Sequence, residues 1–375
     1  MSGRSRINYL LLLALSLSVV SWTASVLLHM PDTPWSIYSD VVSFWYRGIY
    51  EPGERSTCVD YFFEYPPLAC FIVYASISIG GDSLMNYYLS FSTLSLPAFI
   101  ALGFTTYWIS NRAGRGWMAP MLVLSPSLIV YGIYNFDHFF IALVTLSLIA
   151  YLSGRRSVGA LLLGVSISTK LISVFLLPVY LIFSSKAEMP RTVAYAIIGA
   201  AVPLLPVIVL NPGWLSEFLR YHSTWYLENA WFVWIFGDPY SQSARTFSFV
   251  LMGYLILKSY INATDLLRSS FTVLSAFLLG SYVFTPQMLV WLVPLMPLLP
   301  LNSVALAYPI LESSNVLIIL SWFGNYNPLM PGSPTQIFAL IRAVALAYLY
   351  VTVMEPRLLE RLSSKIFQRP RIWGS

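Results

Sequence analysis

One lysine, Lys170, interrupts the apolar stretch GVSISTKLISVF, residues 164–175. An ammonium group at bilayer depth costs at least about 2.5 kcal/mol, so an anion or a water-filled cavity must compensate for it. A lysine that snorkels to the membrane surface, or that pairs with a structural carboxylate, is the simpler explanation. Because ionisable residues inside a membrane mark functional sites by default, we favour a binding site for a negatively charged, membrane-embedded ligand.

Acidic and amide side chains supply complementary chemistry. Asp40, in YSDVVSFW, lies shortly beyond the first apolar run, where a carboxylate can act as a general base at the bilayer surface. Standing alone, Asp40 would be interpreted as an ordinary solvated loop acid. In YNFDHFF, the residues Asn135, Asp137 and His138 share one short turn between two apolar runs. The simpler explanation of this turn is a helix cap, but a cap needs only one of the three residues.

Three further stretches place polar groups beside aromatic residues or helix breaks. FLRYHSTW brings Arg220 and His222 into an aromatic-rich loop, although its aromatic residues are also typical of an interfacial belt. The proline pair after Glu64, in YFFEYPPLACF, predicts the start of a short helix at the membrane surface. In FTPQMLVWLVP, Pro286 precedes Gln287 and interrupts an apolar run, which predicts a discontinuous helix lining a cavity.

The composition determines what must position these groups. The chain is 57% hydrophobic and only 10% charged, and apolar runs recur from residue 7 to residue 353. We therefore expect an all-α, polytopic transmembrane bundle of about 11–13 membrane segments, with juxtamembrane helices in the first outer loop. Residues 1–354 form one predicted domain, and residues 355–375 form a basic cytoplasmic tail on anionic lipid headgroups. We attribute the net charge of +5 to basic residues that orient the chain in the membrane, and not to binding of nucleic acid.

Basic residues orient the predicted segments. The expected spans are 7–29, 84–109, 117–134, 138–153, a hairpin at 157–185, 192–210, 244–261, 269–285, 287–300, 303–323 and 335–353. With the N-terminus inside, the cytoplasmic side collects 15 of the 21 basic residues, namely Arg4, Arg6, Arg112, Arg115, Arg155, Arg156, Lys186, Arg191, Lys258, Arg268, Arg357, Arg361, Lys365, Arg369 and Arg371. The long loops 30–83 and 211–243 then face the opposite side. Glu312 falls inside a predicted span, and the sequence does not decide whether it faces the interior.

This orientation places Lys170 near the outer leaflet. Basic residues flank 157–185 on both sides, so the segment crosses an even number of times, although it is too short for two full crossings. Thirteen residues from Ser157 to Thr169 carry a helix about 20 Å, most of the way through a core of about 30 Å. Two short helices that meet at Thr169 and Lys170 therefore fit.

The order of these motifs resembles the GT-C superfamily of membrane glycosyltransferases. Within it, the chain is most similar to the polyprenyl-phosphate-mannose-dependent mannosyltransferases and the catalytic subunit of GPI mannosyltransferase I. The resemblance is carried by Asp40 and by EYPPL at 64–68, NFDHFFIAL at 135–143, GALLLGVSISTKLISVFLLP at 159–178 and FTPQMLVWLVP at 284–294. These stretches cover residues 40–294 in the family's order.

The resemblance implies an inverting transfer of a sugar, with mannose favoured, from a polyprenyl- or dolichyl-phosphate donor to a hydroxyl acceptor. Asp40 would be the catalytic base, Asp137 the second acidic residue, and Lys170 would face the lipid phosphate. Gln287 would line the same cavity, and we add as substrate-binding candidates Arg220, His222, Glu64, Asn135 and His138. The family often carries a second acid two residues after the first, but position 42 is Val here, and the family's SPQY is TPQM. A metal site at Asp40 is therefore not expected, and neither is a cofactor.

Other functions remain compatible with these features. A flippase or transporter of lipid-linked sugars also needs charges and broken helices at mid-membrane, but it should show paired repeats, which are not evident. A noncatalytic scaffold has no need of Asp40 and Lys170 on one side. The acceptor can be a lipid, a glycan or a protein, and membrane lipids are the other expected partners. The expected location is the plasma membrane of a prokaryote or the endoplasmic reticulum, with the site on the non-cytoplasmic side. Cys58 and Cys70 would both lie outside, but a spacing of twelve does not establish a disulfide.

Overall fold

The chain folds into a bundle of α-helices. The computed structural model describes residues 3–49 and 57–355, without the side chains of residues 3–8 and 48–49, and contains no strand within these ranges. Five helices are long and apolar enough to cross a membrane: α1 (Gly3–Leu28), α4 (Leu84–Arg112), α10 (Met189–Leu210), α15 (Leu301–Trp322) and α16 (Pro334–Met354). The expected all-α polytopic bundle is confirmed, and the protein is a multi-pass membrane protein.

The remaining elements are shorter than the five long helices, although α13 (Gln242–Ile261) has 20 residues. The shorter apolar helices are α3 (Pro67–Gly80), α7 (Asp137–Leu152), α8 (Arg156–Ile167) and α14 (Leu266–Gly280), together with the apolar segment Leu171–Ile182, which consists of η2 (Leu171–Leu176) and α9 (Leu177–Ile182). The others are α2 (Asp40–Phe44), η1 (Trp45–Ile49), α5 (Met118–Leu122), α6 (Pro126–Tyr131), α11 (Trp214–Ser223), α12 (Val233–Phe236), α13, η3 (Pro286–Trp291) and η4 (Val293–Leu298). Beyond the five long helices, the expected 11–13 segments remain a prediction. The basic tail, apart from Glu355, lies outside the described residues.

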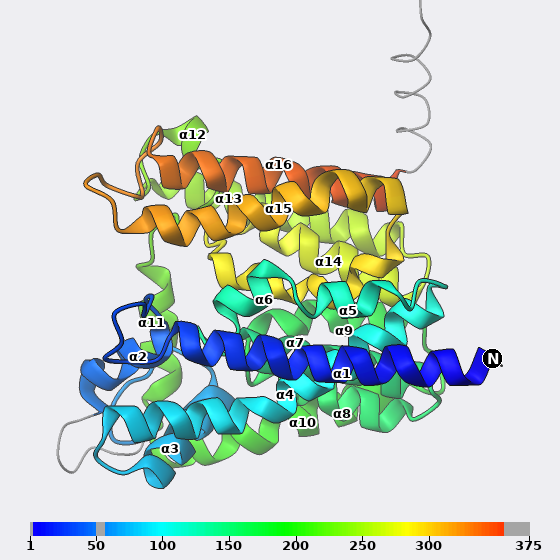
Figure 1. Ribbon diagram of the computed structural model, residues 1–375, viewed down its shortest axis with the longest axis horizontal. Coiled ribbons are helices and arrows are strands. Elements are labelled where there is room, and N and C mark those ends of the chain that lie inside the picture. The colour runs from blue at the N-terminus through cyan, green and yellow to red at the C-terminus, as the bar shows by residue number, and fades with distance from the viewer. Residues whose placement is uncertain (1–2, 50–56, 356–375) are drawn as a thin grey trace, which may run out of the picture.

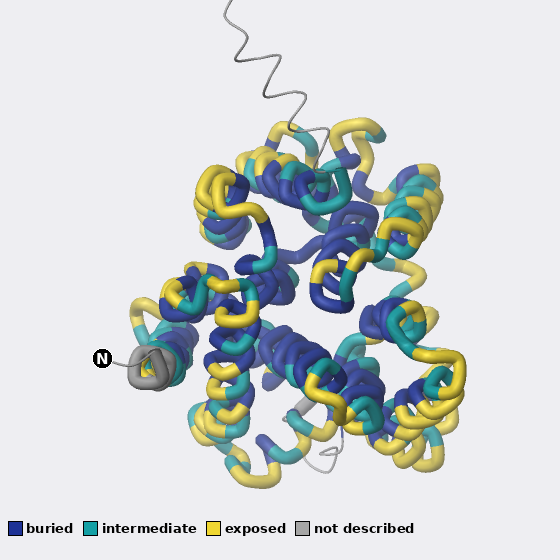
Figure 2. Tube along the Cα trace, turned by 90° about the vertical axis from the view of Figure 1, so that its right-hand side faces the viewer, coloured by how far each residue is buried: buried dark blue, intermediate teal, exposed yellow. Residues whose placement is uncertain are grey.

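Most helices run along the long axis of the molecule, so the bundle has two distinct ends (Figure 1). The chain begins at the right-hand end, where α16 also finishes, while α2 and α11 lie at the left-hand end. We call the left-hand end, where α2 begins with Asp40, the site end, and the opposite end, where α4 finishes with Arg112, the basic end. A view along the helices shows buried residues facing the interior and exposed ones on the periphery (Figure 2).

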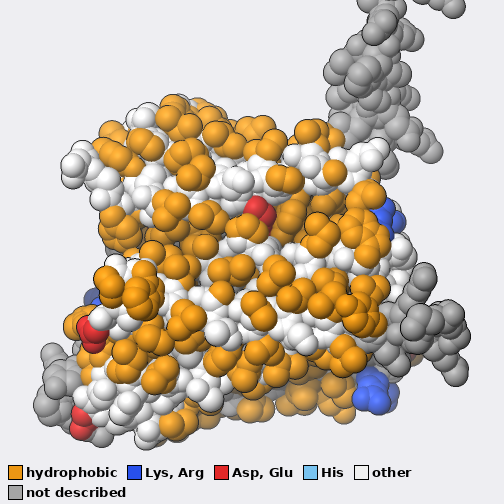
Figure 3. Space-filling model, viewed as in Figure 1, with side chains coloured by type: hydrophobic (Ala, Val, Ile, Leu, Met, Phe, Trp, Pro, Cys, Tyr) orange, Lys and Arg blue, Asp and Glu red, His pale blue; other side chains and the backbone are white. Residues whose placement is uncertain are grey.

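The surface between the two ends is dominated by apolar side chains, and most of the visible charged groups lie near the ends (Figure 3). Exposed large apolar residues occur on several helices, for example Val202 and Val209 on α10 and Val250 and Leu257 on α13. Such a surface cannot be hydrated without a large cost, because apolar area exposed to water is unfavourable. The periphery of the bundle is therefore suited to contact with lipid.

Two predicted spans are irregular in the structure. The expected span at 117–134 is not one continuous helix, because the chain breaks between α5 and α6, where Pro126 occupies the first turn of α6 and Ser125 caps it. Proline is tolerated at that position but disrupts a helix interior. The predicted segment 287–300 consists of η3 and η4, which are short 3₁₀ turns, and this agrees with the helix break predicted from Pro286.

The predicted hairpin at 157–185 is present. Chain direction reverses between α8 and η2, and Tyr180 on the returning arm is hydrogen-bonded to Ser147 on α7 at 2.7 Å. Glycine allows α8 to pack closely on α10, since a Cβ at Gly164 would collide with the Ala196 carbonyl and one at Gly199 with that of Leu161. Small residues at a helix crossing permit this approach. The hairpin is thereby held with its tip at the site end.

Candidate functional site

The Asp40 carboxylate is held by three hydrogen-bond donors. Asp40 is the first residue of α2, whose N-terminus is capped by the Ser39 hydroxyl. Its Oδ1 accepts a hydrogen bond from the Tyr38 hydroxyl at 3.0 Å. Its Oδ2 accepts one from Asn135 Nδ2 at 2.7 Å and one from the Tyr65 hydroxyl at 3.3 Å. Donors from three separate segments fix the carboxylate in one orientation.

Asp40 is a stronger base than an ordinary surface aspartate. Burial raises its pKa to about 6, and the negative charge of Glu64 acts in the same direction. The hydrogen bonds from Tyr38 and Asn135 and the positive charge of Arg47 oppose this rise. A carboxylate with a pKa near 6 is mostly ionised at neutral pH yet accepts a proton more readily than a solvated one. These are the properties required of a general base.

Lys170 occupies the tip of the hairpin, in extended backbone between α8 and η2. Its Nζ lies 3.0 Å from Oδ1 of Asp137, and the same oxygen accepts a hydrogen bond from Trp291 Nε1 at 2.5 Å. The Lys170 ammonium also faces the rings of Trp291 at 5.5 Å and Tyr65 at 5.9 Å. The predicted helix break at Lys170 is confirmed. The Asp137 carboxylate compensates the ammonium within the protein, and the expectation that Lys170 also faces a lipid phosphate stays a prediction.

Tyr65 connects the two charged groups. Its hydroxyl donates to Asp40, and its ring lies against the Lys170 ammonium. Asn135 and Asp137 reinforce the connection because they belong to one turn, Asn135 contacting Asp40 and Asp137 contacting Lys170. Asn135 Nδ2 also lies 2.6 Å from the Tyr65 hydroxyl. Asp40 and Lys170 therefore converge on Tyr65, at the same end of the bundle, as their assignment to one site requires.

Two further charged residues near Asp40 were not predicted to belong to the site. Arg47 forms an ion pair with Glu64 at 2.5 Å and donates through Nε to Ser43 at 3.1 Å. Glu228 accepts a hydrogen bond from Trp225 Nε1 at 3.1 Å, and burial raises its pKa to about 7, with the Asp40 charge adding to the rise. Sequence reasoning could have included both, because Arg47 lies two residues after YSDVVSFW and Glu228 lies three residues after FLRYHSTW.

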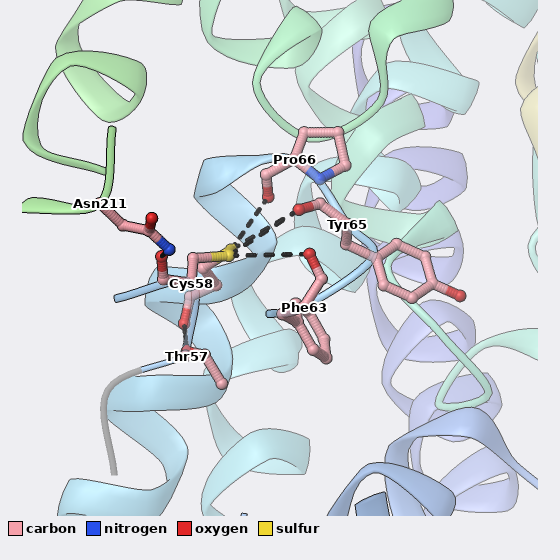
Figure 4. Close-up of a disulfide and its surroundings, with 7 residues drawn as sticks. Thr57, Cys58, Phe63, Tyr65, Pro66 and Asn211 are labelled. Carbon is pink, nitrogen blue, oxygen red and sulfur yellow. Dashed lines mark hydrogen bonds between the residues drawn. A yellow bond between two sulfur atoms is a disulfide. The ribbon is translucent and has the colours of Figure 1, made fainter. Parts of the chain in front are cut away.

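A disulfide between Cys58 and Cys70 supports the segment that carries Tyr65. The sulfur of Cys70 lies 3.6 Å from the Tyr65 carbonyl oxygen, and Figure 4 shows the Tyr65 ring pointing away from the disulfide. The Leu68 N–H donates to the carbonyl of Ser168, two residues before Lys170, at 2.8 Å. The disulfide-bonded segment and the tip of the hairpin are thus fastened together at the positions that place Tyr65 and Lys170.

The other predicted site residues differ in how closely they approach this group. His222 is half-buried, its Nδ1 lies 2.8 Å from the Phe218 carbonyl oxygen, and both Glu64 and Lys170 influence its pKa, which burial lowers. His138 is fully buried among the rings of Phe91, Phe99 and Phe139. No contact of its imidazole with Asp40 or Lys170 is found among the described residues. His222 therefore remains close to the site, whereas His138 serves the core.

Arg220 and Gln287 are not joined to the group by any contact among the described residues. The side chain of Arg220 is exposed on α11 and forms no hydrogen bond or ion pair within the described ranges. Gln287 is buried on η3, and its Oε1 has no hydrogen-bond partner in the described part of the chain. Because an unpaired buried amide oxygen is costly, Gln287 is available to a further donor. Both residues remain predictions.

A second buried polar group joins α15, α16 and α6, and sequence reasoning missed most of it. Arg342 is fully buried on α16 and donates to Asn315 Oδ1 at 2.9 Å and to the Phe284 carbonyl. Asn315 Nδ2 donates to the Ser127 hydroxyl at 2.9 Å, while the Ser127 N–H donates to Glu312 at 2.7 Å. Glu312 faces the interior, which the sequence left open. Arg342 interrupts an apolar run in the same way as Lys170, and this signal could have identified it.

No cluster of three or more His, Cys, Asp or Glu residues able to hold a metal occurs in residues 3–49 and 57–355. The expectations of no metal and no cofactor remain untested predictions. No protein-family model matches the chain, and the comparison with curated proteins gives no match. The resemblance to the GT-C superfamily therefore stays an expectation based on the motifs quoted above.

Proposed function

We propose that the protein is a membrane glycosyltransferase that moves a sugar, with mannose favoured, from a polyprenyl-phosphate donor to a hydroxyl acceptor. The observation that carries this proposal is the convergence of Asp40 and Lys170 on Tyr65 at one end of the bundle. A base with a raised pKa and a fixed cation are the two groups that such a transfer needs. The Cys58–Cys70 disulfide favours a non-cytoplasmic location for this end, because disulfides persist in oxidising compartments.

The chemistry follows from the positions of these groups. Asp40 takes the proton of the acceptor hydroxyl as its oxygen attacks the anomeric carbon of the sugar. The bond between that carbon and the phosphate oxygen breaks, the electron pair leaves with the lipid phosphate, and the configuration inverts. Glu64, Arg47 and Glu228 lie close enough to Asp40 to interact with it electrostatically, and we assign these three groups to the acceptor side of the site.

Lys170 stabilises the negative charge that grows on the departing phosphate. An ammonium has three N–H donors, and the described residues supply one carboxylate acceptor, Asp137. Asp137 and Trp291 fix the ammonium in place, so Asp137 acts here as a positioning residue and not as a second base. Preorganised charge of this kind requires no rearrangement when the reaction occurs.

The test uses the full chain reconstituted in liposomes with polyprenyl-phosphate mannose that carries a radiolabel in the sugar. With a mixture of short alkyl mannosides and membrane lipids as acceptors, we expect label to leave the donor. Asp40→Asn should lower the rate by about 10²- to 10⁴-fold, the usual contribution of a general base. Asp32→Asn is the matched control, since Asp32 is an exposed acid of the same loop, in a left-handed conformation that Asn tolerates.

Each outcome decides between functions. Full activity of Asp40→Asn would remove Asp40 from the mechanism. Movement of intact donor across the bilayer without cleavage of the sugar would replace the proposal with a transporter. Neither cleavage nor movement of this donor would reject the proposed donor class.

A further inference from the structure

A cavity opens at the basic end of the bundle, away from the group around Asp40. Its volume is about 250 Å³, and it lies where four connections meet, after α4, α7, α13 and η4. Its polar lining consists of Arg112, Arg115, Arg268 and Asp265. Three guanidinium groups thus face a single carboxylate.

Few carboxylates oppose the positive charge of these arginines. Arg112 lies over the ring of Trp108 at 5.4 Å, and Arg115 donates to the carbonyl oxygens of Pro297 and Leu299. Neither has a carboxylate within ion-pair distance in the described part of the chain. Asp265 lies 3.8 Å from Arg268 but uses its Oδ1 to cap α14, by accepting the Arg268 N–H at 2.9 Å. The cavity therefore has a clear excess of positive charge.

The helix end adds to this preference for an anion. Leu266 and Leu267, the first two residues of α14, line the cavity, so the partial positive charge of the helix N-terminus faces it. The remaining lining is apolar and includes Leu152 and Leu298. Guanidinium groups match the oxygens of a phosphate, while the leucines suit a glycerol and the start of its acyl chains.

We infer that this cavity binds the phosphate group of an anionic phospholipid from the leaflet that surrounds the basic end. A free phosphate ion offers the same oxygens, but it leaves the apolar part of the lining uncovered. A phospholipid is also supplied by the membrane that surrounds the bundle. The site is separate from the proposed transfer reaction and does not depend on it.

The experiment measures lipid retention by native mass spectrometry. The full chain is released from nanodiscs that contain equal amounts of phosphatidylglycerol and phosphatidylcholine. Wild-type protein should retain one phosphatidylglycerol in preference to phosphatidylcholine. Arg112→Gln combined with Arg268→Gln should weaken that retention about 30-fold, since each basic group near a lipid headgroup contributes about a tenfold or smaller factor. Both side chains are exposed, so the variant is expected to fold, which circular dichroism checks.

A matched control removes the same number of charges elsewhere at the basic end. Arg155 and Arg191 are exposed and do not line the cavity, so Arg155→Gln with Arg191→Gln should retain the lipid as wild type does. Equal loss in both double variants would overturn the proposal in favour of general surface attraction, and so would full retention by Arg112→Gln with Arg268→Gln. A separate thermal-shift series compares inorganic phosphate with phosphatidylglycerol. Stabilisation by inorganic phosphate alone, with none from the lipid, would overturn the lipid as the source of the phosphate.

Discussion

Two lysine–carboxylate pairs lie at opposite ends of the bundle and differ in their surroundings. At the site end, Lys170 and Asp137 lie 3.0 Å apart with side chains 11% and 0% exposed. At the basic end, Lys258 and Glu355 lie 2.6 Å apart, 34% and 43% exposed. The Lys258–Glu355 pair has the shorter distance but contributes less to stability, because water screens its exposed charges. At the buried pair, a charge that loses its partner is left without compensation from water or from another group. The strength of these two ion pairs therefore depends more on burial than on the distance between the charged atoms.

The largest effect is expected from breaking the buried pair. Lys170→Met leaves the Asp137 carboxylate buried without a cation, and this should lower the free energy of unfolding by about 3–5 kcal/mol. Denaturant unfolding of the purified protein in detergent measures the loss. Adding Asp137→Asn should recover part of it, because the uncompensated charge is then removed. If the single and double variants lose the same stability, the pair does not couple as described.

A somewhat smaller effect should follow from opening the disulfide at the site end. Cys58 and Cys70 are twelve residues apart, and closing a loop of about this length restricts the unfolded chain by about 3 kcal/mol. Cys58→Ser with Cys70→Ser should lower the stability by that amount and should also slow sugar transfer, because Tyr65 loses its support. The chain has only two cysteines, so a reductant that lowers the stability of the wild type by opening the disulfide should not change the stability of this variant. Unaltered stability and activity would show that the disulfide does not position Tyr65.

These expectations also mark what the sequence could predict. The hairpin at 157–185 followed from basic residues on both flanks and from a length too short for two crossings, and both constraints are local. The break at Lys170 followed from the cost of a charge within an apolar run. Asp40 and Asn135 could be assigned to one face, because membrane orientation restricts each loop to one of two sides. Recurring apolar runs and charge placement therefore predicted the fold class and part of the site.

The remainder depended on contacts between distant segments. The pairing of Lys170 with Asp137 was missed, although both residues were selected, because nothing local specifies which anion a buried ammonium meets. Trp291 could not be connected to Asp137 for the same reason, since 154 positions separate them. Arg342 was missed for a different reason. Its local signal was present, but its partners are Asn315 and backbone carbonyls, which carry no charge that a sequence search would pair with it.

A pH profile tests the electrostatics at the site end on a smaller scale. Asp40 must be ionised to accept a proton, and burial raises its pKa to about 6, so the transfer rate should rise between pH 5 and pH 7. Glu64→Gln should move this rise to lower pH. It removes an anion that disfavours ionised Asp40, and it frees the Arg47 cation that favours it. Asp32→Asn is the control and should leave the pH profile of the transfer rate unchanged. If Glu64→Gln moves the rise in rate to higher pH, the described arrangement of charges around Asp40 is contradicted.

The smallest effect is expected at the exposed pair, and it completes the comparison. Lys258→Met should lower the free energy of unfolding by less than about 1 kcal/mol, because the pair is solvated and holding two flexible side chains together costs conformational entropy. High salt should reduce even this difference, while the loss caused by Lys170→Met should persist, since salt screens exposed charges far more than buried ones. Parallel unfolding curves for both variants at low and high salt measure the contrast. A loss for Lys258→Met as large as that for Lys170→Met would contradict the conclusion that burial sets the strength of these two pairs.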